Sequence, residues 1–160
     1  VAGAKGYIVY RKAGNESSWT TIANIKNGQT VTYKDTKATT NGSKYTYAVR
    51  AYFGGFKGAY AAKAYYRLGT HKISSVTNNA AGTITVKWNQ NGHATGYQVR
   101  YKNGSTDKTV TIKSNKTLNT VIKSLKKGQT YNVYVRGYLN ADGVNYYSAW
   151  SAAKAIKISK

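Results

Sequence analysis

The chain has 160 residues, 41% of them hydrophobic, and its 25 Lys and Arg against four Asp and Glu give a formal net charge of +21. It contains no Cys, which excludes disulfide bonds and thiolate metal sites, and no apolar run approaches the ~20 residues of a membrane span, so we expect no membrane insertion. The charge is dispersed, with 11 basic and two acidic residues up to Gly69 and 14 basic and two acidic residues after it, and such a surface attracts polyanions.

The predicted elements are strands along the whole chain, because side chains of different character alternate with a period of two. Near the amino end, Tyr7 and Val9 alternate with Ile8 and Tyr10. The same period recurs at residues 84–88 and 131–136, and no comparable helical stripe is present. Turn-forming sequences separate the strands at residues 13–17, 27–29, 41–43, 103–105 and 126–129. Short strands at this spacing favour an all-β sandwich or barrel.

The sequence repeats itself once along its length. GYIVYRK at residues 6–12 matches GYQVRYK at 96–102, and two further pairs follow in the same order. A repeat period close to ninety residues indicates tandem domains rather than a solenoid of small units. The further pairs are NGSKYTYAVRAY (41–52) with KKGQTYNVYVRGY (126–138), and GAYAAKAYYRL (58–68) with SAWSAAKAIKI (148–158).

The second copy carries a pattern specific enough to indicate a family. TITVKW ends in Trp88, GYQVRYK supplies the next strand, and LKKGQTYNVYVRGY combines Leu125, Gly128 and Tyr131 before a third strand. This pattern resembles the fibronectin type III domain, in a form common in tandem arrays of Gram-positive bacterial surface proteins. The resemblance implies two tandem immunoglobulin-like antiparallel β-sandwiches, at residues 1–69 and 70–160.

The resemblance also implies structural roles for four residues. Trp88 is expected in the core, and Leu125 and Tyr131 at the corner where the Tyr hydroxyl returns to upstream backbone. Tyr45 takes the place of Tyr131 in the first copy. The family usually has Pro in this turn, and because this chain has none, we expect Gly128 and its counterpart Gly42 to hold the turn.

The first copy departs from the pattern, because Val1 aligns with Asn91 and everything equivalent to residues 70–90 is absent. Its domain at 1–69 therefore lacks strands A and B and keeps strands C to G. About five core side chains would be exposed, each worth ~1.5 to 3 kcal/mol, which rivals the stability of a whole domain. Three explanations stay open: a fragment of a longer protein, strands supplied by another subunit, or an unpaired first unit.

No catalytic, metal or cofactor site is predicted. The two histidines, His71 and His93, have no neighbouring carboxylate in sequence, and we expect both to be solvent-facing loop residues. The acids are too scattered for paired-carboxylate chemistry. We expect them in turn-forming roles, with Glu16 in a hairpin turn, Asp35 before a turn, and Asp107 and Asp142 in loops.

One surface combines aromatic and basic side chains. If the apolar residues of strands C and F point inward, the alternating residues share the outer face of the sheet. Two interpretations stay open for this face, a stabilising cross-strand ladder of Arg and Tyr and a platform for glycans or polyanions. Its members are Arg100, Tyr134, Arg136 and Tyr138 in the second copy, and Tyr10, Arg50 and Tyr52 in the first.

The resemblance and the lack of reactive groups together predict a non-catalytic spacer and interaction module, adhesive in character, of a larger secreted or cell-surface protein. Its expected location is extracellular, and its expected partners are other domains of the parent chain, cell-wall polymers, and a strand-donating neighbour for residues 1–69. One alternative is an electrostatic binder of teichoic acid, nucleic acid or acidic glycan. Another is a subunit of a surface filament completed by strands from a neighbour.

Overall fold

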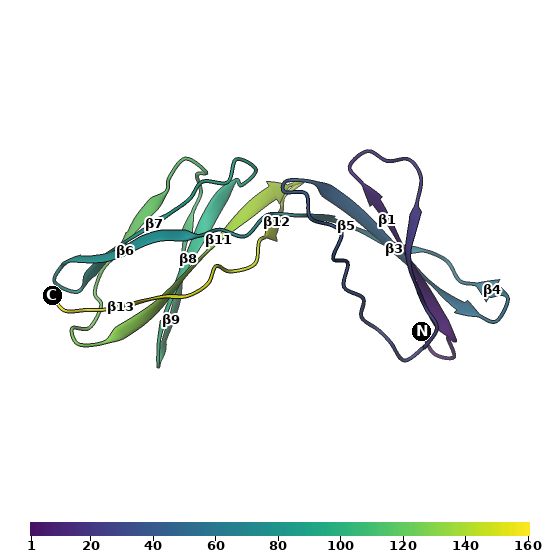
Figure 1. Cartoon of the computed structure of the whole chain (residues 1–160), viewed down its shortest axis with the longest axis horizontal. Coiled ribbons are helices and arrows are strands. Elements are labelled where there is room, and N and C mark those ends of the chain that lie inside the picture. Colours follow the sequence, from purple (N-terminus) through teal and green to yellow (C-terminus); the bar gives the residue numbers. More distant parts are fainter. The chain divides into compact units, whose positions relative to one another are not determined.

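The computed structural model describes residues 1–160 and consists of strands β1 to β13 without any helix. The chain divides into two compact units, unit 1 at Val1–Arg67 and unit 2 at Leu68–Lys160 (Figure 1). Every strand pairing is antiparallel, so the all-β fold class predicted from the alternating pattern is confirmed. No helix that is long and apolar enough to cross a membrane is present.

Unit 2 is a sandwich of a three-stranded sheet and a five-stranded sheet. The small sheet has the order β10-β7-β6, and the large sheet has the order β12-β11-β8-β9 with β13 beside β11. The strands are β6 (Ile73–Ala80), β7 (Thr83–Trp88), β8 (Gly96–Asn103), β9 (Thr106–Ile112), β10 (Asn119–Ile122), β11 (Thr130–Ala141), β12 (Val144–Tyr147) and β13 (Lys154–Lys157).

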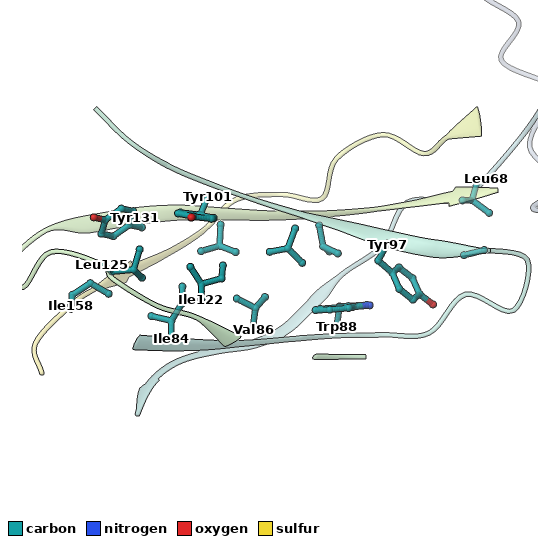
Figure 2. Packing of buried hydrophobic residues seen from close by; sticks show 14 residues of the cluster. Leu68, Ile84, Val86, Trp88, Tyr97, Tyr101, Ile122, Leu125, Tyr131 and Ile158 are labelled. Carbon is teal, nitrogen blue, oxygen red and sulfur yellow. The ribbon is translucent and has the colours of Figure 1, made fainter. Parts of the chain in front are cut away.

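The core of unit 2 lies between its two sheets. Alternate residues of β7 point inward, and Ile84, Val86 and Trp88 are all at most 3% exposed. Facing them, Tyr97 of β8 is fully buried with its ring 5.4 Å from that of Trp88, and Figure 2 shows the two side by side. Val135 of β11 is also fully buried. Each such side chain contributes roughly 1.5 to 3 kcal/mol through burial, so the sandwich depends on both layers being present.

The same corner precedes the long strand of both units. In unit 2 the Tyr131 hydroxyl accepts a hydrogen bond of 3.2 Å from the amide of Lys126, and Gly128 of the turn has φ +82°. In unit 1 the Tyr45 hydroxyl accepts one of 3.2 Å from the amide of Thr40, and Gly42 has φ +79°. Glycine adopts these positive φ angles without a Cβ clash, which allows the turn to form without proline.

Unit 1 contains a single five-stranded sheet, and no second sheet faces it. Its order is β2-β1-β3-β4, with β5 also beside β3. Residues 31–35, which follow β2, lie outside every strand and are drawn without an arrow in Figure 1. The strands are β1 (Gly6–Ala13), β2 (Thr20–Ile25), β3 (Lys44–Phe53), β4 (Phe56–Lys57) and β5 (Ala61–Tyr66).

The central strand pairs of the two units have the same register. Val9 of β1 lies opposite Val49 of β3, as Val99 of β8 lies opposite Val135 of β11. The environments differ, because Val135 is fully buried under the second sheet whereas Val49 is 37% exposed. The inner face of unit 1, which carries Val9 and Val49, is therefore open where that of unit 2 is covered.

This difference predicts unequal costs for one substitution made in both units. Val135→Ala should lower the free energy of unfolding of unit 2 by about 2 kcal/mol, because buried methyl groups are lost and a cavity remains. Val49→Ala should cost unit 1 less than about 1 kcal/mol, since Val49 is already partly solvated. Native-state hydrogen exchange at the amides of β3 and β11 measures both values in one molecule, and equal losses would contradict an open inner face in unit 1.

Candidate functional site

The outer face of unit 2 carries a stack of aromatic rings and guanidinium groups, here named ladder 2, formed by Arg100, Arg136, Tyr147 and Trp150. The Cζ atom of Arg136 lies 4.0 Å from the ring centroid of Tyr147 and 4.4 Å from that of Trp150. The Cζ atom of Arg100 lies 5.9 Å from the Trp150 ring. Such contacts between cations and aromatic faces are stabilising by about 0.5 to 2 kcal/mol each, so the rings hold the two arginines in place.

Both arginines of ladder 2 also have polar partners within the unit. Arg136 donates from Nε and Nη2 to Oε1 of Gln98, at 2.9 and 2.7 Å, and its burial lowers the pKa of its guanidinium. Arg100 donates from Nε and Nη2 to the two carboxylate oxygens of Asp107, at 2.7 and 2.5 Å. The hydrogen bond from Arg100 is the main cause of a lowered pKa at Asp107.

Asp107 corrects one expectation. A loop position was expected for Asp107, but it lies in β9, and the antiparallel pairing with β8 brings it within reach of Arg100. The sequence alone does not show where the turn ends and the strand begins, because Asp107 follows the NGS turn within a few positions.

Trp150 reaches ladder 2 because two serines fasten its segment along β11. The hydroxyl oxygens of Ser148 and Ser151 accept hydrogen bonds of 3.1 Å from the amides of Gly137 and Val135. The backbone amides of the same serines donate to the carbonyls of Gly137 and Val135, at 3.0 and 2.8 Å. This double attachment fixes residues 148–151 beside β11.

Two further residues expected on the outer face of unit 2 lie close to ladder 2 without being part of it. Tyr138 is buried, with its ring 6.0 Å from that of Tyr147. Tyr134 is half-buried and lies opposite Arg100 in the pairing of β11 with β8. Neither Tyr147 nor Trp150 is among the residues predicted for this face.

Unit 1 has an equivalent stack, here named ladder 1, formed by Lys12, Trp19, Tyr60 and Arg50. The Cζ atom of Arg50 lies 4.6 Å from the ring centroid of Tyr60, and its nitrogens donate to the Tyr60 hydroxyl and to two backbone carbonyls. The Trp19 ring is stacked on Tyr60 at 6.3 Å, and Nζ of Lys12 lies 4.7 Å from the Trp19 ring. Tyr10 meets Tyr60 edge-on at 5.3 Å.

Tyr60 and Trp150 occupy matching positions in the third repeated pair, GAYAAK and SAWSAAK. That match was the signal that could have identified the two rings as counterparts. Tyr52 was expected there as well, but its hydroxyl donates to the carbonyl of Ile25 at 3.3 Å, so it bridges to the end of β2 instead of joining ladder 1.

The inner face of unit 1 holds a polar cluster where unit 2 is apolar. Arg11 occupies the register position of Tyr101 in unit 2, and its Nη1 lies 2.8 Å from Oδ2 of Asp35. The Tyr47 hydroxyl donates to the same oxygen at 3.0 Å, and the amide of Lys37 donates to Oδ1 at 2.9 Å. Asp35 was expected only as a turn residue, but it also fastens the segment after β2 to the sheet.

The cluster changes the acidity of its members. Burial opposes ionisation of Asp35, but the hydrogen bonds from Lys37, Arg11 and Tyr47 outweigh it and hold the pKa of its carboxyl below the usual value. Burial, with the hydrogen bond to Asp35, raises the pKa of Tyr47 to about 12. The cluster therefore consists of an ionised carboxylate between a guanidinium and a neutral phenol at neutral pH.

His71 was expected to face solvent, and this expectation was wrong. The residue is 4% exposed, its Nδ1 accepts a 3.2 Å hydrogen bond from the amide of Gly137, and its ring lies 5.3 Å from that of Tyr97. A Cβ atom at position 137 would lie 2.3 Å from Cε1 of His71, so the absence of a side chain at Gly137 makes room for the ring. His93, by contrast, is exposed.

The proximity of His71 to Ser148 does not make a nucleophile and base. The Ser148 hydroxyl is 3.4 Å from Nδ1 of His71, but it donates to the carbonyl of Ala149 at 2.9 Å, and Nδ1 already accepts from Gly137. Nε2 of His71 is buried without a hydrogen-bond partner, so no acid orients the ring. No three His, Asp or Glu side chains gather as a metal site would require.

The family model for the fibronectin type III domain matches residues 72–154. No curated protein matches the chain.

Two solved structures from chicken resemble the chain across nearly all of its length. The CNTN1 FN1-FN3 domains are 22% identical with a TM-score of 0.50, over 97% of this chain and 56% of that one. The two fibronectin type-III domain segment from tenascin is 20% identical with a TM-score of 0.50, over 98% of this chain and 86% of that one. This chain thus spans little more than half of the first structure, and at these identities the likeness concerns the fold alone.

The buried His71 predicts a pH dependence for unit 2. Burial lowers its pKa below the ordinary value of about 6.5, so the unfolded state binds the proton first and stability falls as the pH drops below about 6.5. His71→Phe should remove this part of the pH dependence, because phenylalanine has no titratable group. The amide of Gly137 still has the Ser148 hydroxyl as its hydrogen-bond acceptor in this variant. Urea unfolding at several pH values between neutral and mildly acidic measures it. His93→Phe is the exposed control and should keep the wild-type slope; a wild-type slope in His71→Phe would contradict the burial.

The Asp35 cluster predicts a second contrast, this time between two acids. Asp35→Asn should destabilise unit 1 by about 2 kcal/mol at neutral pH, because Arg11 and Tyr47 lose a charged partner. The wild-type contribution is present above the unfolded pKa of about 3.9 and is lost as the pH falls through the lowered pKa of Asp35. Hydrogen exchange of β1 and β3 is the measurement. Asp107→Asn, which breaks an exposed pair, is the control, and an equal effect of both variants would argue against a structural role for Asp35.

Proposed function

Because this chain belongs to the fibronectin type III domain family, we propose that it is a non-catalytic spacer and interaction module of a larger secreted or cell-surface multidomain protein. Domains of this family are generally non-catalytic and are typical of the spacer and interaction regions of multidomain chains. The finer parts of the proposal are an extracellular location, an adhesive role in a bacterial cell wall, and an arrangement as tandem domains at 1–69 and 70–160. The shared register of Val9 with Val49 and of Val99 with Val135 supports the tandem arrangement.

The observation that carries the proposal is that the polar groups which resemble reactive ones are already engaged in hydrogen bonds with the backbone or with other side chains. The Ser148 hydroxyl donates to backbone, Nδ1 of His71 accepts from backbone, and Asp35 is held by Arg11 and Tyr47. A hydrolytic nucleophile needs a free base beside it, and the arrangement around Ser148 offers none.

The module proposal predicts no turnover by the chain alone. Residues 1–160 incubated with panels of glycosides, esters and peptides should give rates equal to buffer. Any rate above buffer should persist in His71→Phe, which removes the histidine beside the Ser148 hydroxyl. An activity in the purified chain that this substitution or Ser148→Ala abolishes would overturn the proposal.

A second candidate function is electrostatic binding of anionic polymers such as teichoic acid, nucleic acid or acidic glycans. The observation that favours it is the net charge of +21, together with the engagement of Asp35 and Asp107 by arginines. Few acids thus remain to offset the lysines. Counterion release makes the affinity of such binding fall steeply with added salt.

Titration of DNA, teichoic acid and a neutral glycan at two ionic strengths separates the two candidates. General electrostatics predicts similar weak binding of both polyanions, lost at high salt, with Arg100→Ala and Lys108→Ala weakening it by the same small factor. These two residues lie on neighbouring strands, and Lys108 is outside ladder 2, which makes it the matched control. One preferred ligand, lost in Arg100→Ala or Tyr134→Ala but kept in Lys108→Ala, would instead assign a specific site to the outer face.

A further inference from the structure

The sheet of unit 1 carries a cavity of about 460 Å³, here named the lysine pocket, beside the hairpin formed by β3 and β4. Figure 1 shows β4 as a short strand beside the end of β3. Ligand sites for small molecules have volumes of roughly 300 to 1,000 Å³, so this hollow is large enough for one. The pocket is lined by Lys5, Ile8, Asn24, Lys26, Tyr52, Gly54 and Lys57.

The lysine pocket lies on the outer face of the sheet. Ile8 of its lining is directly opposite Arg50 of ladder 1 and directly opposite Asn24, and opposed residues of paired strands share a face. Val9 and Val49 lie on the other side of the same strands. In unit 2 the outer face carries ladder 2 and no second sheet covers it. The pocket therefore exists whether or not the inner face of unit 1 is covered.

The residue opposite Tyr52 explains why the pocket is open. Tyr52 pairs with Lys57 across the hairpin, at the position where Tyr138 pairs with Tyr147 in unit 2. There the Tyr147 ring lies 6.0 Å from the Tyr138 ring and 4.0 Å from Cζ of Arg136, so it occupies the space beside the strand. Unit 1 has an ammonium side chain where unit 2 has a ring, and the space is left as a hollow.

The aromatic wall of the pocket is fixed in place. The Tyr52 hydroxyl donates to the carbonyl of Ile25 at 3.3 Å, which holds the ring across Gly6. A Cβ atom at position 6 would clash with the Tyr52 hydroxyl, so the absence of a side chain at Gly6 makes room for the ring. An ordered ring presents its surface to a ligand without a further loss of side-chain entropy on binding.

No carboxylate neutralises the three lysines of the pocket. The acids of unit 1 are Glu16 and Asp35. Glu16 lies in the hairpin between β1 and β2, where it accepts from the amide of Ala13, and Asp35 is held by Arg11 on the inner face. The three lysines are exposed, and none of them forms an ion pair. Three ammonium groups around one hollow repel one another, so an anion with more than one charge is favoured there.

The chemistry of the lining favours a phosphate group over a carboxylate. An ammonium group is a compact charge with three donors, which suits a tetrahedral oxyanion, whereas a planar carboxylate is matched best by the paired N–H groups of arginine. The nearby Arg50 already donates to the Tyr60 hydroxyl and to two backbone carbonyls. A phosphate monoester carries about −1.5 to −2 charges at neutral pH and so neutralises more of the lysine charge than a carboxylate does.

We propose that the lysine pocket of unit 1 binds a small phosphate monoester, with the phosphate among Lys5, Lys26 and Lys57 and the organic group against Ile8 and Tyr52. Such a site goes beyond a spacer role, because unit 1 becomes a receptor for a small ligand. It also differs from attraction by the net charge of +21, since it depends on where three particular lysines lie.

The test is a titration of the whole chain with glycerol 3-phosphate at constant ionic strength, followed by the NMR shifts of backbone amides. Shifts are expected at residues 5–8, 24–26 and 52–57, and not at the equivalent positions 95–98 and 138–147 of unit 2. Acetate and glycerol are the control probes, one with a carboxylate and one without charge. Both should bind at least about tenfold more weakly, because neither supplies a group with two charges to the three lysines.

Variants of the protein locate the site. Lys57→Tyr introduces the residue that unit 2 has at this position and should weaken binding at least about tenfold, because a charge is lost and a ring enters the pocket. Lys63→Tyr makes the same change on β5, outside the pocket, and should alter the affinity less than about twofold. Lys26→Gln removes a lysine from the other side of the pocket and should also weaken binding, so the test does not depend on one variant.

Several outcomes would overturn the proposal. Equal weakening in Lys57→Tyr and Lys63→Tyr would mean that only the net charge attracts the ligand. Acetate that binds as tightly as glycerol 3-phosphate would exclude recognition of the phosphate, and shifts confined to residues outside the lining would exclude the pocket. Binding of DNA or teichoic acid by a chain that ignores glycerol 3-phosphate would leave general electrostatics without a monoester site. None of these results bears on the non-catalytic role, which the turnover assay tests separately.

Discussion

A β-strand sends successive side chains to opposite sides of its sheet, and the rest of this structure depends on that constraint. In β8 and β11 one set of residues is large and apolar and requires a second layer, while the other set is aromatic and basic and can face water. Val99 and Val135 meet the first requirement under β7, and Arg100 and Arg136 meet the second within ladder 2. Because unit 1 has the same alternation and register, it has the same requirement for cover over Val9 and Val49 without the sheet that provides it.

The outer faces show how a very basic chain places arginine on a sheet. The guanidinium groups lie over aromatic rings and donate to Gln98, to Asp107 or to backbone carbonyls, so their charge is held in a fixed geometry. Arginine suits this arrangement because it is planar and weakly hydrated. The fastening of Trp150 by Ser148 and Ser151 shows that a ring of ladder 2 depends on backbone contacts with β11, so the outer face and the core of unit 2 are physically linked.

The Arg11 and Asp35 pair explains how the segment after β2 stays on an uncovered sheet. Unit 2 keeps its equivalent segment in place by pairing β10 with β7 and by burying Ile122 and Leu125. Unit 1 lacks a β7, and a carboxylate held by a guanidinium, a phenol and an amide takes over part of that role. A pair of this kind with little solvent exposure fixes geometry more than it adds stability, since desolvation offsets much of its attraction. The pair positions residues 31–35 beside the inner face of the unit 1 sheet and leaves the space between this segment and the sheet unfilled.

The sequence by itself determined the strands, the repeat and the corner at Tyr45 and Tyr131, because these depend on side-chain period and on residues a few positions apart. Only the tertiary structure decided that His71 is buried against Gly137, that Asp107 reaches Arg100 across two strands, and that Trp150 and Tyr60 complete the ladders. These contacts join residues that are brought together by the register of the sheets and by the return of the chain along β11. A local sequence pattern contains no information on either. The repeat marked Tyr60 and Trp150 as equivalent, but the side of the sheet on which they lie follows from the hydrogen bonds that fasten each segment to its neighbouring strand.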